Sequence, residues 1–205
     1  MPNSQLTQWA AKLQSIAQAG LCYSESSFDQ ERYQQIRDIA AEMMAAQTEM
    51  PLEKVKDIFC GESGYQTPKL DTRAAIFQGD RVLLVKELDG RWSLPGGWVD
   101  ADISVGESAV KEVFEEAGLK ASIDLVVAIQ DRDRHNLPTY PWKVCKVLVL
   151  CTALGGEFTP NTETSESGYF ALDELPPLSE HRNTAEQIAL CFQAKQAEHW
   201  KTIIE

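Results

Sequence analysis

The pattern of apolar residues changes about a third of the way along the chain. In the first part, large apolar side chains recur at the three- to four-residue spacing of a helix. They are Leu6, Trp9, Leu13 and Ile16, then Tyr33, Ile36, Ile39 and Met43. Glycine is scarce before Gly61. This pattern predicts helices over 4–19, 28–47 and 51–60, with an apolar stripe that must be buried somewhere.

From residue 70 onward the apolar residues gather in short runs typical of strands. These runs are 72–77, 81–87, 122–129 and 143–153. The first two flank Gln78-Gly79-Asp80, which predicts a hairpin. Helical spacing returns at 104–117 and 183–200. Strands interspersed with two helices favour an α/β or α+β sandwich over a repeat of parallel βαβ units.

The turn-rich stretch 60–69 reads as a linker between these two parts. We therefore expect a small all-α domain over 1–62 and a second domain over 63–205. The helical domain is interpreted as a packing or dimerisation element. A second interpretation, that it also covers the active site of a partner subunit, stays open.

Charge narrows the range of partners. The 205 residues carry 19 Lys and Arg against 31 Asp and Glu, a net charge of −12. This balance argues against an extended grip on nucleic acid or on an anionic membrane. A phosphorylated substrate would be repelled unless metal cations or a local Arg and Lys cluster reversed the sign.

The cysteines and the N-terminal sequence indicate where in the cell we expect the protein to be. Five cysteines, an odd number and none in CxxC spacing, argue against a disulfide framework and a zinc site. The N-terminus has no basic region followed by an apolar region, as a signal peptide would. No apolar run is long enough to span a bilayer. We expect a cytoplasmic protein that does not enter a membrane.

The stretch from Gly96 to Leu119 carries the clearest chemistry. Ser104 and Glu107 have capping-box spacing, and Gly118 is placed as a helix C′ glycine. Between them we expect one face to pack on a sheet, formed by Val110, Val113, Phe114 and Ala117.

Three glutamates share another face of this predicted helix. Glu112, Glu115 and Glu116 stand at i, i+3 and i+4, so their carboxylates should converge and repel one another. Such a cluster suits a hard divalent cation such as Mg²⁺. The alternative is a solvated acidic face in which Lys111 bridges Glu107 and Glu115.

These residues resemble the Nudix box, GX5EX7REUXEEXGU with U aliphatic. Gly97 and the run Lys111 to Leu119 match the box, and Trp92 to Gly97 match its usual W-x-L-P-G-G lead-in. The sequence departs from the box twice. Ile103 replaces the first glutamate, which puts the number of bound metal ions in question, and Lys111 replaces the arginine.

Residues 65–190 resemble a Nudix subfamily with an N-terminal helical domain, which includes CDP-choline and ADP-ribose pyrophosphatases. The resemblance implies an α/β/α sandwich around a mixed sheet. It implies metal-dependent hydrolysis of the pyrophosphate bond in a nucleoside diphosphate linked to another moiety. Mg²⁺, with Mn²⁺ as a substitute, is the implied cofactor, and a homodimer the implied assembly.

The resemblance also implies roles for single residues. Glu112 and Glu116 would be metal ligands, together with Glu115 and the Gly97 carbonyl. The general base would be Glu163 or Glu166 in the loop before the 169–172 run, with Glu115 on the box helix as the fallback. We favour Glu166 slightly, because its backbone should be better anchored.

Cations and aromatic residues near the box are candidates for substrate binding. They are Arg73, Arg132 and His135, with Arg134 and Arg182 nearby, and Trp142 beside Tyr140 for stacking on a base.

Two other functions stay open. A degraded box could sense a nucleotide without cleaving it, and Ile103 keeps that hypothesis alive. Nudix chemistry also extends to RNA ends, although the acidic balance argues against high nucleic-acid affinity. The sequence does not identify the preferred base or linked moiety.

Overall fold

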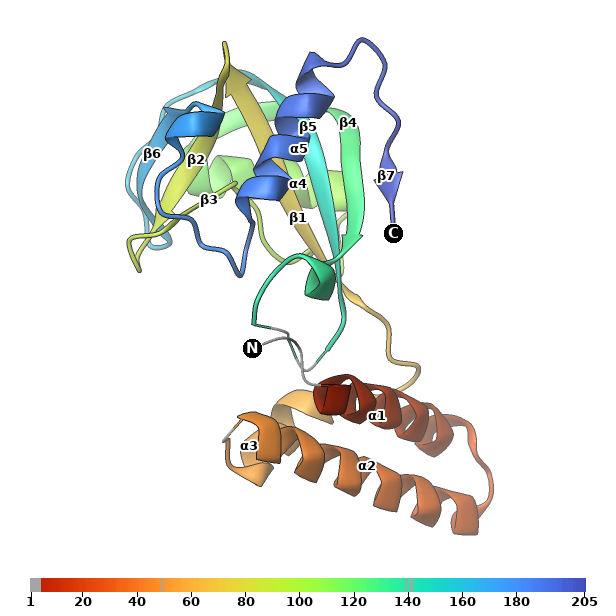
Figure 1. The fold of residues 1–205 in the computed structure, drawn as a ribbon. Coiled ribbons are helices and arrows are strands. Elements are labelled where there is room, and N and C mark those ends of the chain that lie inside the picture. The colour runs from red at the N-terminus through yellow and green to blue at the C-terminus, as the bar shows by residue number, and fades with distance from the viewer. Residues whose placement is uncertain (1–4, 49, 139, 141) are drawn as a thin grey trace. The chain divides into compact units, whose positions relative to one another are not determined.

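The structure is a computed structural model that describes residues 5–48, 50–138, 140 and 142–205. The chain divides into two compact units (Figure 1). The first runs to Pro68 and includes the 139–143 segment, and the second comprises Lys69–Pro138 and Val144–Glu205. Among the described residues, no helix is both long and apolar enough to cross a membrane.

The first unit is helical, as predicted. It contains α1 (Gln5–Tyr23), α2 (Ser27–Thr48) and α3 (Leu52–Phe59). Its core is built by Ala10, Ala40, Ala41, Met44, Val55 and Phe59. The predicted stripe is buried only in part: Leu13 and Met43 pack against this core, whereas Trp9, Ile16 and Ile39 are about half exposed. The alanines of the core, Ala10 on α1 and Ala40 and Ala41 on α2, are fully buried.

The second unit contains one mixed sheet, two helices and two short 3₁₀ turns. In chain order the elements are β1 (Lys69–Gln78), β2 (Arg81–Glu87), β3 (Trp92–Ser93), α4 (Val105–Ala117), β4 (Leu119–Asp131), η1 (Arg132–Arg134), β5 (Val144–Gly156), β6 (Thr164–Phe170), η2 (Leu172–Glu174), α5 (Ala185–Gln196) and β7 (Ile203–Ile204). The strand order is β3-β2-β1-β5-β4-β7, and β6 pairs with β2. β1 and β5 are parallel, whereas β4 and β5 are antiparallel.

The two helices cover opposite faces of the sheet, with α5 in front and α4 behind in Figure 1. Side chains alternate between the faces, as a strand requires. Ala74 and Ile76 pack with α4, whereas Ala75, between them, packs with α5. The expected α/β class and α/β/α sandwich are thus confirmed.

The expected hairpin is also present. Phe77 pairs with Val82 and Gln78 with Arg81 across the turn. Gly79 has a φ of +58°, a conformation that glycine adopts at little cost. The sequence analysis did not predict β3, β6 or β7.

Candidate functional site

Helix α4 begins and ends where the sequence predicts. The Ser104 side chain accepts a hydrogen bond from the Glu107 N–H, and the Glu107 carboxylate accepts one from the Ser104 N–H at 2.9 Å. Gly118 ends the helix with a φ of +68°. One part of the predicted packing face is wrong: Phe114 is 57% exposed. The residues against the sheet are Ala109, Val113 and Ala117, so the buried face is rotated toward the glutamates.

The Leu94–Val99 loop runs alongside β1. Three main-chain hydrogen bonds fix it: Thr72 N to Gly97 O at 2.9 Å, Ala74 N to Pro95 O at 2.8 Å, and Val99 N to Leu70 O at 3.0 Å. Gly96 has a φ of +146°, and a Cβ there would stand 1.9 Å from the Thr72 carbonyl oxygen. This close approach sets the loop directly against β1.

Glu116 is the most deeply buried acid of α4, at 3% exposure. The Gly96 N–H donates to its Oε2 at 2.8 Å. Burial raises the pKa of Glu116 to about 7, with Arg73 and the Gly96 N–H opposing the shift. A positive charge nearby would stabilise the ionised form of this buried carboxylate.

Glu112 lies one turn earlier and is partly buried. Burial raises its pKa, and the negative charges of Glu115 and Glu163 act in the same direction. Its carboxylate lies beside Gly97, where a Cβ would come within 3.2 Å of the carboxylate oxygens. The glycine therefore leaves room for this carboxylate.

Glu115 points elsewhere. Lys111 contacts Glu115 at 3.2 Å and Asp100 at 3.1 Å. These carboxylates raise the pKa of Lys111, so the lysine stays charged. The suggestion that Lys111 holds Glu115 is supported, whereas the bridge from Lys111 to Glu107 is absent, since Glu107 caps the helix.

The three glutamates do not converge as the sequence analysis expected. Over the described ranges of the chain, no three His, Cys, Asp or Glu side chains are grouped closely enough to hold a metal ion. Like charges repel at this spacing, and Lys111 and the Gly96 N–H draw two of the three carboxylates apart.

The loop before β6 is fastened to the end of α4. Asn161 Nδ2 donates to the Glu115 carbonyl at 2.8 Å, and Thr164 Oγ1 donates to the Glu116 carbonyl at 2.7 Å. Asn161 Oδ1 accepts from the N–H groups of Glu163 and Thr164, both at 2.9 Å. Asn161 and Thr164 thus satisfy carbonyls that the helix end leaves unpaired. They also hold Glu163 close enough for its charge to act on Glu112.

Glu166, which the sequence analysis favoured, is in a different environment. It lies on β6 opposite Lys86, whose Nζ contacts Glu166 Oε1 at 2.8 Å. The Glu166 side chain is more than half exposed. This glutamate is paired across the sheet, and its backbone is anchored as expected.

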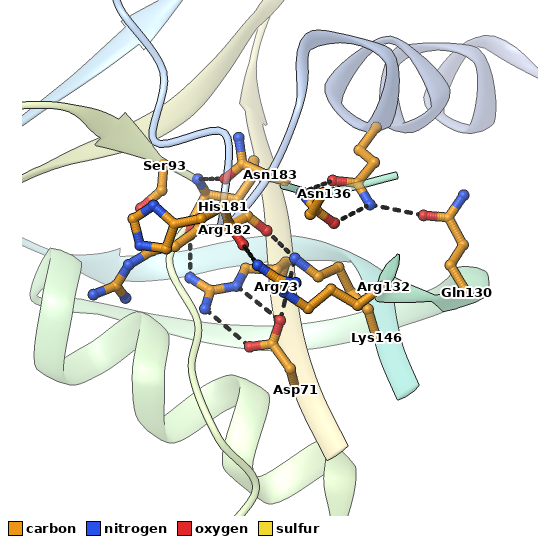
Figure 2. Close-up of polar contacts among 12 residues, drawn as sticks. Asp71, Arg73, Ser93, Gln130, Arg132, Asn136, Lys146, His181, Arg182 and Asn183 are labelled. Carbon is orange, nitrogen blue, oxygen red and sulfur yellow. Dashed lines mark hydrogen bonds and ion pairs between the residues drawn. The ribbon is translucent and has the colours of Figure 1, made fainter. Parts of the chain in front are cut away.

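Two of the predicted substrate-binding cations are buried. Arg73 is 4% exposed, and its Nη2 contacts Asp71 Oδ1 at 2.9 Å. Arg132 is 1% exposed and donates to the carbonyls of Pro138 and His181. Both guanidinium groups are thus engaged by groups of the protein itself (Figure 2).

The remaining predicted binding residues are placed as follows. His135 Nε2 lies 2.9 Å from Glu205 Oε1 near the end of the chain. Arg134 is largely exposed, 4.0 Å from Asp131. Tyr140 and Trp142 have ring centroids 5.8 Å apart and belong to the first unit. The substrate roles assigned to these residues stay predictions.

The sequence analysis overlooked a buried polar cluster around Asp71. Lys146 Nζ contacts Asp71 Oδ2 at 3.3 Å, and Arg73 contacts the same carboxylate (Figure 2). Burial lowers the pKa of Lys146 to about 7, although Asp71 opposes the shift. A usable signal was present, because Lys146 interrupts an otherwise apolar strand sequence.

Comparisons with known proteins identify the family of this chain. A sequence profile of the Nudix domain matches residues 67–191, and a profile described as a UDP-X-like N-terminal oligomerisation domain matches residues 4–59. The YjhB protein of Bacillus subtilis (strain 168), named as a candidate ADP-ribose pyrophosphatase, is 38% identical. That match covers 97% of this chain and 98% of the relative.

Solved structures extend the comparison. An ADP-ribose pyrophosphatase from Streptococcus suis 89-1591 is 58% identical with a TM-score of 0.64, over 68% of this chain and all of that one. A UDP-X diphosphatase is 32% identical with a TM-score of 0.64, over 99% of this chain and all of that one. The chain therefore belongs to the Nudix hydrolase family and carries a UDP-X-like N-terminal oligomerisation domain.

Proposed function

We propose that the protein hydrolyses the pyrophosphate bond of a nucleoside diphosphate linked to a second moiety, in a metal-dependent reaction. ADP-ribose and UDP-linked compounds are the first substrates to consider, because the most similar proteins described above carry those names. CDP-choline remains a third candidate from the sequence resemblance. The observation that carries the proposal is the pair formed by buried Glu116 and partly buried Glu112, next to the Gly96-Gly97 loop.

The oxygen ligands at this site fit a hard cation. Glu112 and Glu116 supply carboxylate oxygens, which Mg²⁺ prefers, and burial makes both charges costly unless a cation is near. The Gly97 carbonyl accepts one hydrogen bond from Thr72 and keeps a second lone pair. Bound Mg²⁺ or Mn²⁺ would neutralise charge on the pyrophosphate oxygens and activate the attacking water.

Glu163 is the better candidate for the general base. It is exposed, it is held by the Asn161 and Thr164 contacts to α4, and its charge acts on Glu112. Glu166 is paired with Lys86 on β6 instead. A general base must reach the proton that it removes. In choosing the base, the location of Glu163 near Glu112 therefore counts for more than the better-anchored backbone of Glu166.

The two loop glutamates make a matched pair of variants. We expect Glu163→Gln to lower kcat about 10²- to 10⁴-fold, the usual contribution of a general base. Glu166→Gln should leave kcat within about threefold. Both are to be measured across pH at saturating Mg²⁺, with Mn²⁺ affinity as a control that should barely change. If the two variants exchange these results, Glu166 is the base, and if both stay active, Glu115 becomes the candidate.

A substrate panel tests the proposed function itself. Wild-type protein with Mg²⁺ or Mn²⁺ should release product from ADP-ribose, a UDP-linked sugar or CDP-choline, and chelation should stop the reaction. Binding of these compounds without turnover would identify a sensing module. Turnover of capped or short RNA alone would identify RNA-end processing. The expected cytoplasmic location stays a prediction.

We propose that the helical unit forms a homodimer. The residues matched by the oligomerisation profile include Trp9 and Ile16, which lie seven residues apart on one face of α1 and are about half exposed. A second copy of the chain would bury them. We expect light scattering to show a dimer at micromolar concentration and Trp9→Glu to shift it to a monomer. Gln8→Glu, at an exposed neighbour, should remain dimeric; if Trp9→Glu does too, this face is not the interface.

A further inference from the structure

The 179–183 segment, just before α5, is held in place by hydrogen bonds from buried side chains. Three consecutive carbonyls of this segment each accept a hydrogen bond from a different buried residue (Figure 2). Asn136 Nδ2 donates to Glu180 at 2.7 Å, Arg132 Nη2 to His181 at 3.0 Å, and Lys146 Nζ to Arg182. Such a set of contacts fixes the backbone of a surface segment.

The same segment is tied to the loop beside Glu116. Asn183 Oδ1 accepts from the Leu94 N–H at 2.8 Å, two residues before Gly96. Ser179 N also donates to the Trp92 carbonyl at 2.8 Å. The 179–183 segment is therefore fixed relative to the Gly96-Gly97 loop.

Arg182 extends its side chain from this fixed segment. Its Nε contacts Glu87 Oε2 at 2.8 Å, and Ser93 Oγ donates to the other oxygen of Glu87 at the same distance. Glu87 is buried, so it orients the guanidinium through one nitrogen. A guanidinium has two further nitrogens, Nη1 and Nη2, arranged as a fork that matches phosphate oxygens.

Arg182 lies next to the loop that contacts Glu116. Its partner Glu87 also accepts from Ser93 Oγ, and Asn183 accepts from the Leu94 N–H, two residues before Gly96, whose N–H donates to Glu116. Arg73 is buried against Asp71. The Arg182 side chain is 34% exposed, so it can reach a ligand that Arg73 cannot.

We propose that Arg182 is a substrate-binding residue whose Nη1 and Nη2 donate to oxygens of one phosphate group of the diphosphate substrate, while Nε stays on Glu87. This inference rests on the proposed function, since it assigns a phosphate contact at the same site. It supplies a local cation that a chain with a net charge of −12 needs. The buried donors from Asn136, Arg132 and Lys146 fix the backbone of this segment, and Glu87 orients the guanidinium before substrate arrives, which lowers the entropy lost on binding.

The test compares Arg182→Met with Arg81→Met. Arg81 is a matched control, because it is an exposed arginine whose Nη2 contacts Glu174 at 3.4 Å. For the substrate that the panel identifies, we expect Arg182→Met to raise KM at least tenfold and to lower kcat/KM by 10- to 100-fold. Arg81→Met should change both less than twofold. Arg182→Lys should fall between, since it keeps the charge but not the fork.

A direct binding measurement separates this inference from the proposed function. Calorimetry with Mg²⁺ and inorganic pyrophosphate should show weaker binding to Arg182→Met than to wild type, and unchanged binding to Arg81→Met. If wild type cleaves nothing in the panel, the proposed function fails, yet weakened pyrophosphate binding still supports Arg182. If folded Arg182→Met keeps the wild-type KM and the wild-type affinity for pyrophosphate, the inference is wrong. Arg182 then only forms an ion pair with Glu87. Failure of wild type to bind pyrophosphate would also overturn the inference.

Discussion

Replacing Glu116 by glutamine is expected to lower kcat by two to four orders of magnitude, about 3–5 kcal/mol of barrier. The carboxylate is buried beside the Gly96 N–H, so water cannot substitute for its lost charge. Mn²⁺ affinity should fall in the same variant, measured by electron paramagnetic resonance without substrate. Near wild-type kcat at saturating metal would remove Glu116 from the ligand set.

The control for this change lies on the same helix. Glu107→Gln makes the same substitution at the exposed first turn of α4, where glutamine can still complete the capping box. Its activity should remain within about twofold of wild type. If both variants lose activity to a comparable degree, the loss reflects the total charge of the helix and not metal ligation by Glu116.

The same substitution should remove a pH dependence of stability in the metal-free protein. The pKa of Glu116 is raised from 4.5 to about 7, so the folded state binds more protons than the unfolded state between these values. Stability contributed by this group is therefore complete below pH 4.5 and is lost as pH rises through 7, by about 3 kcal/mol. Urea denaturation should show this loss in wild type, its absence in Glu116→Gln, and recovery of wild type at pH 8 on adding Mg²⁺.

The sequence predicted those features that depend on local chemistry. The hairpin at Gly79, the capping box at Ser104 and the C′ position of Gly118 each require particular residues at short, fixed spacing, and all three are present. Lys111 likewise meets Glu115 because the two stand at i and i+4. The division into a helical and a mixed part followed from a change in periodicity.

Features that depend on distant contacts were not predictable in this way. Phe114 fits the apolar spacing of α4, yet it is exposed, because Glu116 takes a buried position beside the Gly96-Gly97 loop. Arg73 was interpreted as a phosphate ligand, and that role stays a prediction; its burial against Asp71, two residues away on the same strand, was not predicted. The proposed preference for Glu163 over Glu166 rests on contacts of Lys86 and Asn161. Lys86 is remote from Glu166 in sequence, and nothing in the sequence around Asn161 predicts its contacts.

Gly96→Ala is expected to cost at least about 3 kcal/mol of folding stability and to abolish activity. Two independent penalties combine at this position. A φ of +146° is a conformation that residues with a Cβ rarely adopt, and the new Cβ would overlap the Thr72 carbonyl oxygen at 1.9 Å. The oxygen belongs to the backbone of β1, so it cannot move aside without disturbing the sheet.

Gly79→Ala isolates the first of these penalties. Gly79 also has a positive φ, +58°, but a Cβ there would meet nothing within 4 Å. We therefore expect it to cost only about 1–2 kcal/mol and to leave kcat unchanged. Urea denaturation gives the free energy of unfolding of both variants. The extra loss in Gly96→Ala is the cost of the overlap between the new Cβ and the Thr72 carbonyl oxygen. Equal losses would mean that the Gly96 loop can relax away from Thr72, and then the Gly96 N–H would no longer be fixed beside Glu116.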